Sequence, residues 1–419
     1  MVCMIGVGIL FIAIAAIAFL GFVINALFER LKFTDVLPLM LIGLLIGPLL
    51  HLVNVSPTST VAELTPYVTA IAIAFVLFNI GMNIKAKELS KVFGRASAFT
   101  FAVQIAIGIT LAIATFFIFK WSLIEAFIFG FAVSGPSTII VPVLASVVRV
   151  PNKLKVSLVY ESVITDIAEL IVPILLLGFM INSSIINATY IGSFVFTVIF
   201  GSILIGFLSA LFWLYIMNRF KDYSRGYSWV LTMTMVIATY GIAQQFGLNG
   251  AITIFVFGLL FYNIGAREKK SMKSKDILGK YFAIDGDVDH VIKYQREVVF
   301  FVSTFFFVYI GLLFNVQQAT LFSIGIAALL SVAIVPMRAL FTPILGKFMS
   351  EGGIRRKVER RLVSFDMARG LSPAIVATLP LSMGINIPYF VDLIFMLILF
   401  TNIISSVGIA YSYKPKVYK

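Results

Sequence analysis

Long apolar segments separated by short polar ones dominate the chain. A hydrocarbon core about 30 Å thick needs roughly 20 apolar residues per helix, and about thirteen segments meet that length. They lie at roughly 4–28, 36–53, 64–84, 96–119, 122–148, 154–181, 185–217, 227–246, 249–265, 297–315, 318–346, 361–383 and 388–412. Of the 419 residues, 60% are hydrophobic and 12% charged, where soluble domains carry roughly 25% charged residues. The pattern predicts an all-α polytopic membrane protein in which residues 1–419 form a single transmembrane domain.

Basic residues predict how the segments are oriented. All but three of the 32 lysines and arginines lie in alternate loops, at segment ends or in the tail; the exceptions are Lys120, Arg338 and Arg369. Because short cytoplasmic loops carry the excess of lysine and arginine, we expect the N-terminus outside and the C-terminus in the cytoplasm of a plasma-membrane protein. The net charge of +13 then faces the lipid bilayer, so no nucleic-acid partner is expected.

Several kinds of chemistry are disfavoured. The single cysteine, Cys3, excludes an intrachain disulfide, and two histidines, His51 and His290, make a clustered metal site unlikely to form. No nucleophile, base and orienting group occur together, so we expect neither an enzyme nor a cofactor.

A break is predicted near the centre of segment 122–148, at Ser134-Gly-Pro-Ser-Thr138. Pro136 has no amide hydrogen and Gly135 is a weak helix former. Unwound backbone is tolerated at this depth only where it is buried in protein or lines a cavity. A plain proline kink is the alternative.

Acids and hydroxyls gather on segment 154–181. Ser162 precedes Asp166 by four residues and Glu169 follows it by three, so the three share one helical face. Carboxylate and hydroxyl oxygens bind hard cations, and protons compete for the carboxylates. The alternative is structural, with buried acids paired to arginines; it suits Glu161 best, because only two arginines lie inside segments.

Segment 361–383 combines a charge pair with helix breakers. It reads Asp366-Met-Ala-Arg369-Gly-Leu-Ser-Pro373, with Asp366 and Arg369 one turn apart. Charges inside a membrane span are costly and mark functional sites. Two interrupted spans in opposite halves of a chain are typical of transporters built from inverted repeats. We therefore predict two broken helices, one in each half of an inverted repeat.

The motifs resemble those of the cation:proton antiporter superfamily, close to prokaryotic sodium/proton exchangers of the NhaP type. The resemblance covers nearly the whole chain, and Glu161-Ser-Val-Ile-Thr-Asp166 is similar to the family's Glu-Ser-x-x-Asn-Asp motif, the most specific match. Other similar stretches are 31–48, 75–89, 296–312 and the pair Arg369-Gly370.

The resemblance implies a role for each matching position. Asp166 would bind cation and proton alternately, with Ser162 as an oxygen ligand, and Glu161 and Arg369 would form a structural ion pair. The unwound stretch at 134–138 would cross a partner break near Asp166. It also implies a homodimer, with core helices at about 96–181 and 297–383 and dimerisation or scaffold helices at about 1–84 and 185–265.

The sequence departs from the family at three places. Thr165 replaces the asparagine before the aspartate, Ser134-Gly135-Pro136 replaces Thr-Asp-Pro, and Asn79 stands where an acid is often found in the third span. One acid of the ion site is therefore missing. We hypothesise that Glu169 replaces it, because it lies one turn from Asp166.

The predicted function is secondary active antiport, in which a monovalent cation (Na⁺, Li⁺ or K⁺) is exchanged for H⁺ by alternating access, with a role in pH homeostasis. One essential acid predicts one proton per cation and hence electroneutral exchange. A passive, proton-uncoupled pathway for K⁺ or Na⁺ is the alternative, and a non-transporting sensor a third reading. The expected ion-binding residues are Asp166, Ser162, Thr165, Ser134, Gly135 and Glu169, and the other core residues are Pro136, Thr138, Asp366 and Asn79.

Overall fold

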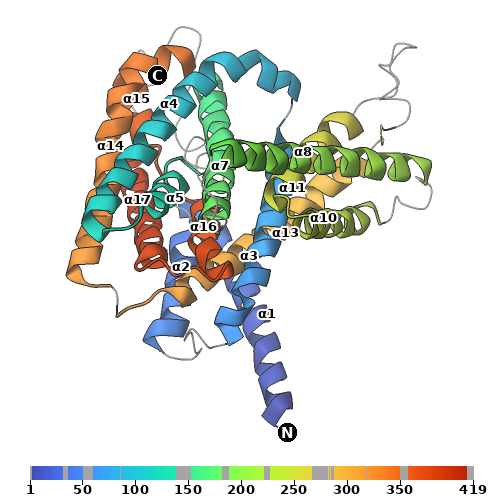
Figure 1. Cartoon of the computed structure of the whole chain (residues 1–419). Helices are drawn as coiled ribbons and strands as arrows, with labels where there is room; N and C mark the ends of the chain where they lie inside the picture. The colour runs from blue at the N-terminus through green and yellow to red at the C-terminus, as the bar shows by residue number, and fades with distance from the viewer. Residues whose placement is uncertain are drawn as a thin grey trace. The chain divides into compact units, whose positions relative to one another are not determined.

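The computed structural model is helical over the residues that it describes, and the predicted all-α class is confirmed (Figure 1). The described residues are 2–31, 36–50, 60–84, 86–137, 152–181, 188–220, 227–266, 282, 284, 287–317, 319–349 and 357–412. The α-helices are α1 (Val2–Leu31), α2 (Val36–Leu44), α3 (Thr60–Asn83), α4 (Ala86–Phe119), α5 (Leu123–Ala132), α7 (Asn152–Ile181), α8 (Ala188–Arg219), α10 (Ser228–Gln245), α11 (Gly250–Gly265), α13 (Asp287–Leu313), α14 (Leu321–Met349), α15 (Lys357–Phe365), α16 (Leu371–Ser382) and α17 (Phe390–Ser412).

Each predicted apolar segment contains a helix. Within the described residues, 7 helices are long and apolar enough to cross a membrane, and five further apolar helices are shorter. These lengths confirm a multi-pass membrane protein. The count of thirteen spans and the inverted repeat stay predictions.

Two helices begin earlier than the apolar pattern indicates. The helix α13 starts at Asp287, whereas the apolar segment starts at 297, and α4 starts at Ala86 rather than 96. Both added stretches are rich in charged residues. A helix satisfies its own backbone hydrogen bonds, so it can continue past the apolar region into the polar interface.

The chain forms two compact units, which are described separately. The first unit comprises residues 1–69, 94–177 and 303–419. In it, α14, α15, α16 and α17 pack together, and α16 also contacts α5 (Figure 1). Helix α2 runs into a π-helical turn at Leu45–Leu49, where Pro48 has no amide hydrogen to donate. A side chain at Gly43 would overlap the backbone of Val308 and Gly311, so these glycines allow α2 and α13 to approach closely.

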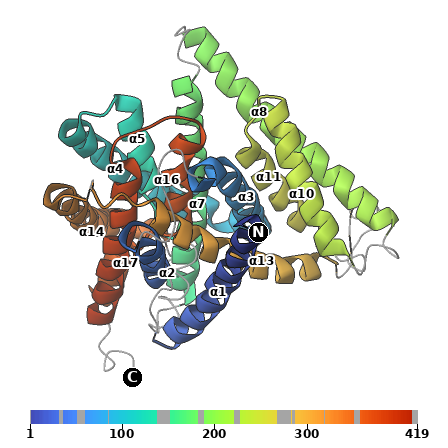
Figure 2. The ribbon, with the colours of Figure 1, turned by 90° about the horizontal axis from the view of Figure 1, so that it is seen from below.

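The second unit comprises residues 70–93 and 178–302. Here α8 lies along α10 and α11 (Figure 2). The indole of Trp213 donates to the hydroxyl of Thr232 at 3.0 Å, which links α8 to α10. Phe78 contacts the ring of Phe257, with 5.5 Å between centroids. The predicted division into core and scaffold helices is a separate question and stays a prediction.

Non-helical backbone lies at both places where a break is predicted, whereas the broken membrane-spanning helices and their crossing at mid-membrane stay predictions. Helix α5 ends at Ala132, and residues 133–137 are not helical. Residues 366–370 separate α15 from α16 in the same way. The amide of Ser137 donates to the carbonyl of Ala368 at 2.9 Å, so the two stretches are in direct contact. Residues 138–150, which hold the rest of the first interrupted segment, lie outside the described part of the chain.

Candidate functional site

The two non-helical stretches are held together by the guanidinium of Arg369. Its Nε donates to the carbonyl of Val133 at 2.8 Å, and its Nη1 donates to the carbonyls of Gly135 and of Met367, the latter at 3.0 Å. The last carbonyls of a helix have no partner within that helix. The buried guanidinium of Arg369 therefore supplies hydrogen bonds to carbonyls at the end of α5 and in the second break.

Helix α17 donates hydrogen bonds to two more carbonyls, one in the second break and one at the end of α15. The side-chain amide of Asn402 donates to the backbone carbonyl of Arg369 at 2.7 Å and to that of Ile398 at 2.8 Å. The hydroxyl of Ser405 donates to the carbonyl of Phe365 at 2.6 Å. Buried backbone groups need such partners, since an unpaired one costs about as much as a lost hydrogen bond.

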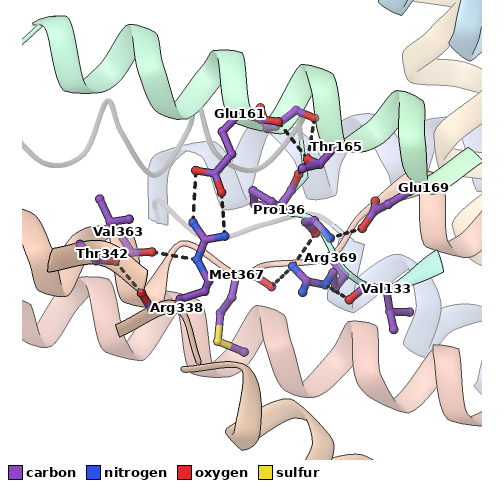
Figure 3. A network of polar contacts seen from close by, with 12 residues as sticks. Val133, Pro136, Glu161, Thr165, Glu169, Arg338, Thr342, Val363, Met367 and Arg369 are labelled. Carbon is purple, nitrogen blue, oxygen red and sulfur yellow. Dashed lines mark hydrogen bonds and ion pairs between the residues drawn. The ribbon is translucent and has the colours of Figure 1, made fainter. Parts of the chain in front are cut away.

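The ion pair of Glu161 is formed with Arg338, and the predicted pairing with Arg369 is wrong. Arg338 donates to both carboxylate oxygens of Glu161, at 2.8 Å and 3.3 Å, and its Nε donates to the carbonyl of Val363 at 2.9 Å (Figure 3). The geometry is bidentate, which favours arginine as a carboxylate partner. Arg369 is instead directed at the backbone of the two breaks. The sequence identified Arg338 as one of two arginines inside apolar segments, but it did not predict Glu161 as the partner of Arg338.

Asp166 lies buried at the amino end of α16. Its side chain is 3% exposed, and its Oδ1 accepts a hydrogen bond from the hydroxyl of Ser372 at 2.8 Å. Ser372 is the second residue of α16, and the amino end of a helix carries a partial positive charge. Both features stabilise an ionised carboxylate. Sequence reasoning missed Ser372, although it lies within the Asp366–Pro373 motif.

Thr165 packs directly against the turn at Gly135. A Cβ added to Gly135 would lie 2.5 Å from Oγ1 and 2.9 Å from Cγ2 of Thr165, and would overlap its Cβ. The Thr165 hydroxyl has three carbonyl acceptors within reach, those of Glu161 and Ser162 at 3.0 Å and that of Pro136 at 3.3 Å. The missing family acid thus has no room at position 135 beside a threonine at position 165.

Glu169 reaches the same turn from α7. Its Oε1 accepts a hydrogen bond from the amide of Gly135, while its Oε2 is buried without a hydrogen-bond partner (Figure 3). Arg369 donates to the carbonyl of Gly135, so the backbone of Gly135 links the carboxyl group of Glu169 to the guanidinium of Arg369. In addition, the helical partner of the Glu169 carbonyl would be the amide of residue 173, and Pro173 has no amide hydrogen to donate.

The remaining predicted residues are placed as follows. The Ser134 hydroxyl donates to the carbonyl of Phe131 at 2.9 Å, and Ser162 and Pro136 are buried in the same region. Asn79 belongs to the second unit, where its carbonyl accepts from the amide of Asn83 at 2.8 Å. Its proximity to the site stays a prediction, and Thr138 lies outside the described residues.

A buried carboxylate beside two contacting helix breaks, in a multi-pass helical fold, is typical of secondary transporters with discontinuous helices. A family profile described as "Sodium/hydrogen exchanger, transmembrane" matches residues 12–411, and the chain belongs to this family. It is therefore a secondary active cation/proton antiporter and not an enzyme. The resemblance that the motifs indicated is confirmed.

Solved structures show the same fold. The sodium proton antiporter MjNhaP1 from Methanocaldococcus jannaschii, in a structure at pH 8, is 17% identical, with a TM-score of 0.71 over 98% of this chain and 96% of that chain. An electron-microscopy structure of the same antiporter is 16% identical, with a TM-score of 0.68 and 99% coverage of both chains. No curated protein sequence gives a significant match.

Proposed function

We propose that this antiporter exchanges one monovalent cation for one proton at Asp166. The observation that supports it best is the placement of Asp166, buried on α7 and hydrogen-bonded to Ser372 at the amino end of α16. Na⁺, Li⁺ and K⁺ are the candidate cations. An uncoupled pathway has no support from family membership.

Opposing forces act on the Asp166 carboxyl group. Burial favours the neutral, protonated form, while the hydrogen bond from Ser372 and the partial positive charge at the amino end of α16 favour the ionised form. A cation or a proton can each neutralise the carboxylate, but both at once would leave an uncompensated positive charge. Exchange one for one keeps the buried charge constant and is electroneutral.

Oxygen atoms around Asp166 complete the proposed cation site. Hydroxyls from Ser162, Thr165 and Ser134 and the backbone at Gly135 are the proposed ligands. A hydroxyl that donates its proton to a carbonyl, as that of Thr165 does, keeps lone pairs for a cation. Glu169 adds a carboxyl group at the Gly135 turn, and we propose that it takes the place of the missing acid.

The wider proposals concern movement and assembly. We propose alternating access, in which the helices around the breaks carry the site across the membrane relative to the scaffold helices. A homodimer in the plasma membrane, with the N-terminus outside and the C-terminus in the cytoplasm, and a role in pH homeostasis complete the proposal.

The test uses the purified protein in liposomes that contain a pH dye. Pulses of Na⁺, Li⁺ or K⁺ are added under a pH gradient to the wild type, Asp166→Asn and Asp289→Asn, the last removing an exposed acid on α13. We expect proton release with the wild type and Asp289→Asn, and none with Asp166→Asn. Undiminished exchange in Asp166→Asn would refute the site, and cation flux without proton movement would refute antiport.

A further inference from the structure

A further buried acid, which is not among the proposed cation ligands, lies in the break between α15 and α16. Asp366 is 2% exposed, and its Oδ2 has no hydrogen-bond partner. The nearby end of α15 is fixed by Arg338, whose Nε donates to the carbonyl of Val363 at 2.9 Å. Asp366 is thus held beside the Glu161–Arg338 pair.

The charged groups that interact with Asp366 are Arg338 of α14, Glu161 of α7 and Arg369 of its own segment, with Arg338 the strongest attraction. Arg369 interacts more strongly with Glu169 than with Asp366. Helix α17 also packs here and contributes the uncharged side chains of Asn402 and Ser405.

When Asp166 is set aside as the exchange site, charge balance in this region leaves one carboxylate in excess. Arg338 already has a counter-ion, since it donates to both oxygens of Glu161. Arg369 and Glu169 both bond the backbone of Gly135, since Arg369 donates to its carbonyl and Glu169 accepts from its amide. An ionised carboxylate that is buried without a cation or enough donors is strongly disfavoured, and such a group takes up a proton instead.

We infer that Asp366 is a second proton-binding site, which shares the guanidinium of Arg338 with Glu161 and binds its proton separately from the one exchanged at Asp166. At neutral pH the group of Glu161, Arg338 and Asp366 then has no net charge. At alkaline pH, loss of the proton puts two carboxylates on one guanidinium. This repulsion weakens the contact between α7, α14 and α15, and exchange slows.

Infrared difference spectroscopy in detergent tests the inference without requiring transport. The C=O stretch of a protonated carboxyl group is recorded during a pH titration of wild type, Asp366→Asn, Glu161→Gln and the exposed control Asp289→Asn. We expect one band to be present at neutral pH in wild type and control and absent in Asp366→Asn. In Glu161→Gln the band should weaken, because Asp366 becomes the counter-ion of Arg338.

A double-mutant cycle in thermal unfolding gives an independent readout. Each single variant should fold, since asparagine reproduces a neutral Asp366 and Asp366 can replace Glu161. Together, Glu161→Gln and Asp366→Asn leave Arg338 without a carboxylate, and we expect a coupling of about tenfold or more in the folded-to-unfolded ratio.

Three results would overturn the inference: an unchanged band in Asp366→Asn, additive effects in the cycle, or failure of Asp366→Asn to fold. In liposomes, Asp366→Asn should retain exchange at alkaline pH where the wild type loses it. The inference rests on the proposed function, but a separate variant tests each of them. Exchange by Asp166→Asn tests the proposed function, whereas the spectra and the cycle test Asp366.

Discussion

Gly135 meets Thr165 so closely that a single added methyl group should disturb the ion site. In Gly135→Ala the new carbon would lie 2.5 Å from the Thr165 Oγ1 and 2.9 Å from its Cγ2. Ordinary contacts between such atoms are about 3.5–4.0 Å. Either the turn at 133–137 or α7 must move by about an ångström, because the contacting atoms of Thr165 lie close to its backbone and not at the end of a long flexible side chain.

The expected cost follows from overpacking of a filled site, which is typically about 1–3 kcal/mol. The side chain of Thr165 cannot turn away freely, because its hydroxyl bonds the carbonyls of Glu161 and Ser162 at 3.0 Å. Movement of the turn would also lengthen the hydrogen bond from Gly135 to Glu169. We therefore expect lower stability together with weaker cation binding.

The assay compares thermal unfolding and cation-dependent proton release for Gly135→Ala and for Gly325→Ala. Gly325 lies in α14 with no atom within 4 Å of an added Cβ, so alanine there should be neutral or stabilising by up to about 1 kcal/mol. Thr165→Ala, which removes both Oγ1 and Cγ2, should restore part of the stability of Gly135→Ala.

Equal stability of Gly135→Ala and Gly325→Ala would refute the packing argument. Stability that falls without any change in the apparent KM for the cation would show that the turn at Gly135 does not shape the ion site.

Two further results are expected. Arg338→Gln should destabilise the fold by about 3–5 kcal/mol, because it leaves Glu161 buried without its guanidinium. Thermal unfolding of this variant is compared with that of the exposed control Arg360→Gln, and an unchanged midpoint would contradict the pairing. Ser372→Ala should raise the apparent KM for the cation by about tenfold, because Asp166 loses a hydrogen bond and such a bond to a charged group contributes about 1.5–3 kcal/mol. Proton release at varied cation concentration measures this KM, and an unchanged value would show that Ser372 is not part of the site.

The helices, and the non-helical backbone at the two places where a break is predicted, were predictable because they depend on local chemistry. Apolar length determines where a helix can cross hydrocarbon, and each apolar segment contains a helix. Gly135 and Pro136 indicated the first break, and Gly370 and Pro373 the second, since these residues weaken helices in any context. The starts of α4 and α13 were missed because a helix that continues into the polar interface leaves no apolar signal.

The partners of the buried charges were not predictable, because they depend on distances between remote parts of the chain. Glu161 and Arg338 are separated by 177 positions, and nothing local distinguishes Arg338 from Arg369 as the partner. Ser372 was missed as the donor to Asp166 for the same reason, at a separation of 206 positions. The sequence could give the residue types of the site but not its connections.

The hydrogen bonds from α17 have a consequence for motion. Asn402 and Ser405 donate hydrogen bonds to the carbonyls of Arg369 and Phe365, as water would do at a solvent-exposed site. Inside hydrocarbon no solvent could replace them, so the interrupted segment cannot slide past α17 without losing both bonds at once. If that segment moves during the proposed transport cycle, we expect α17 to move with it.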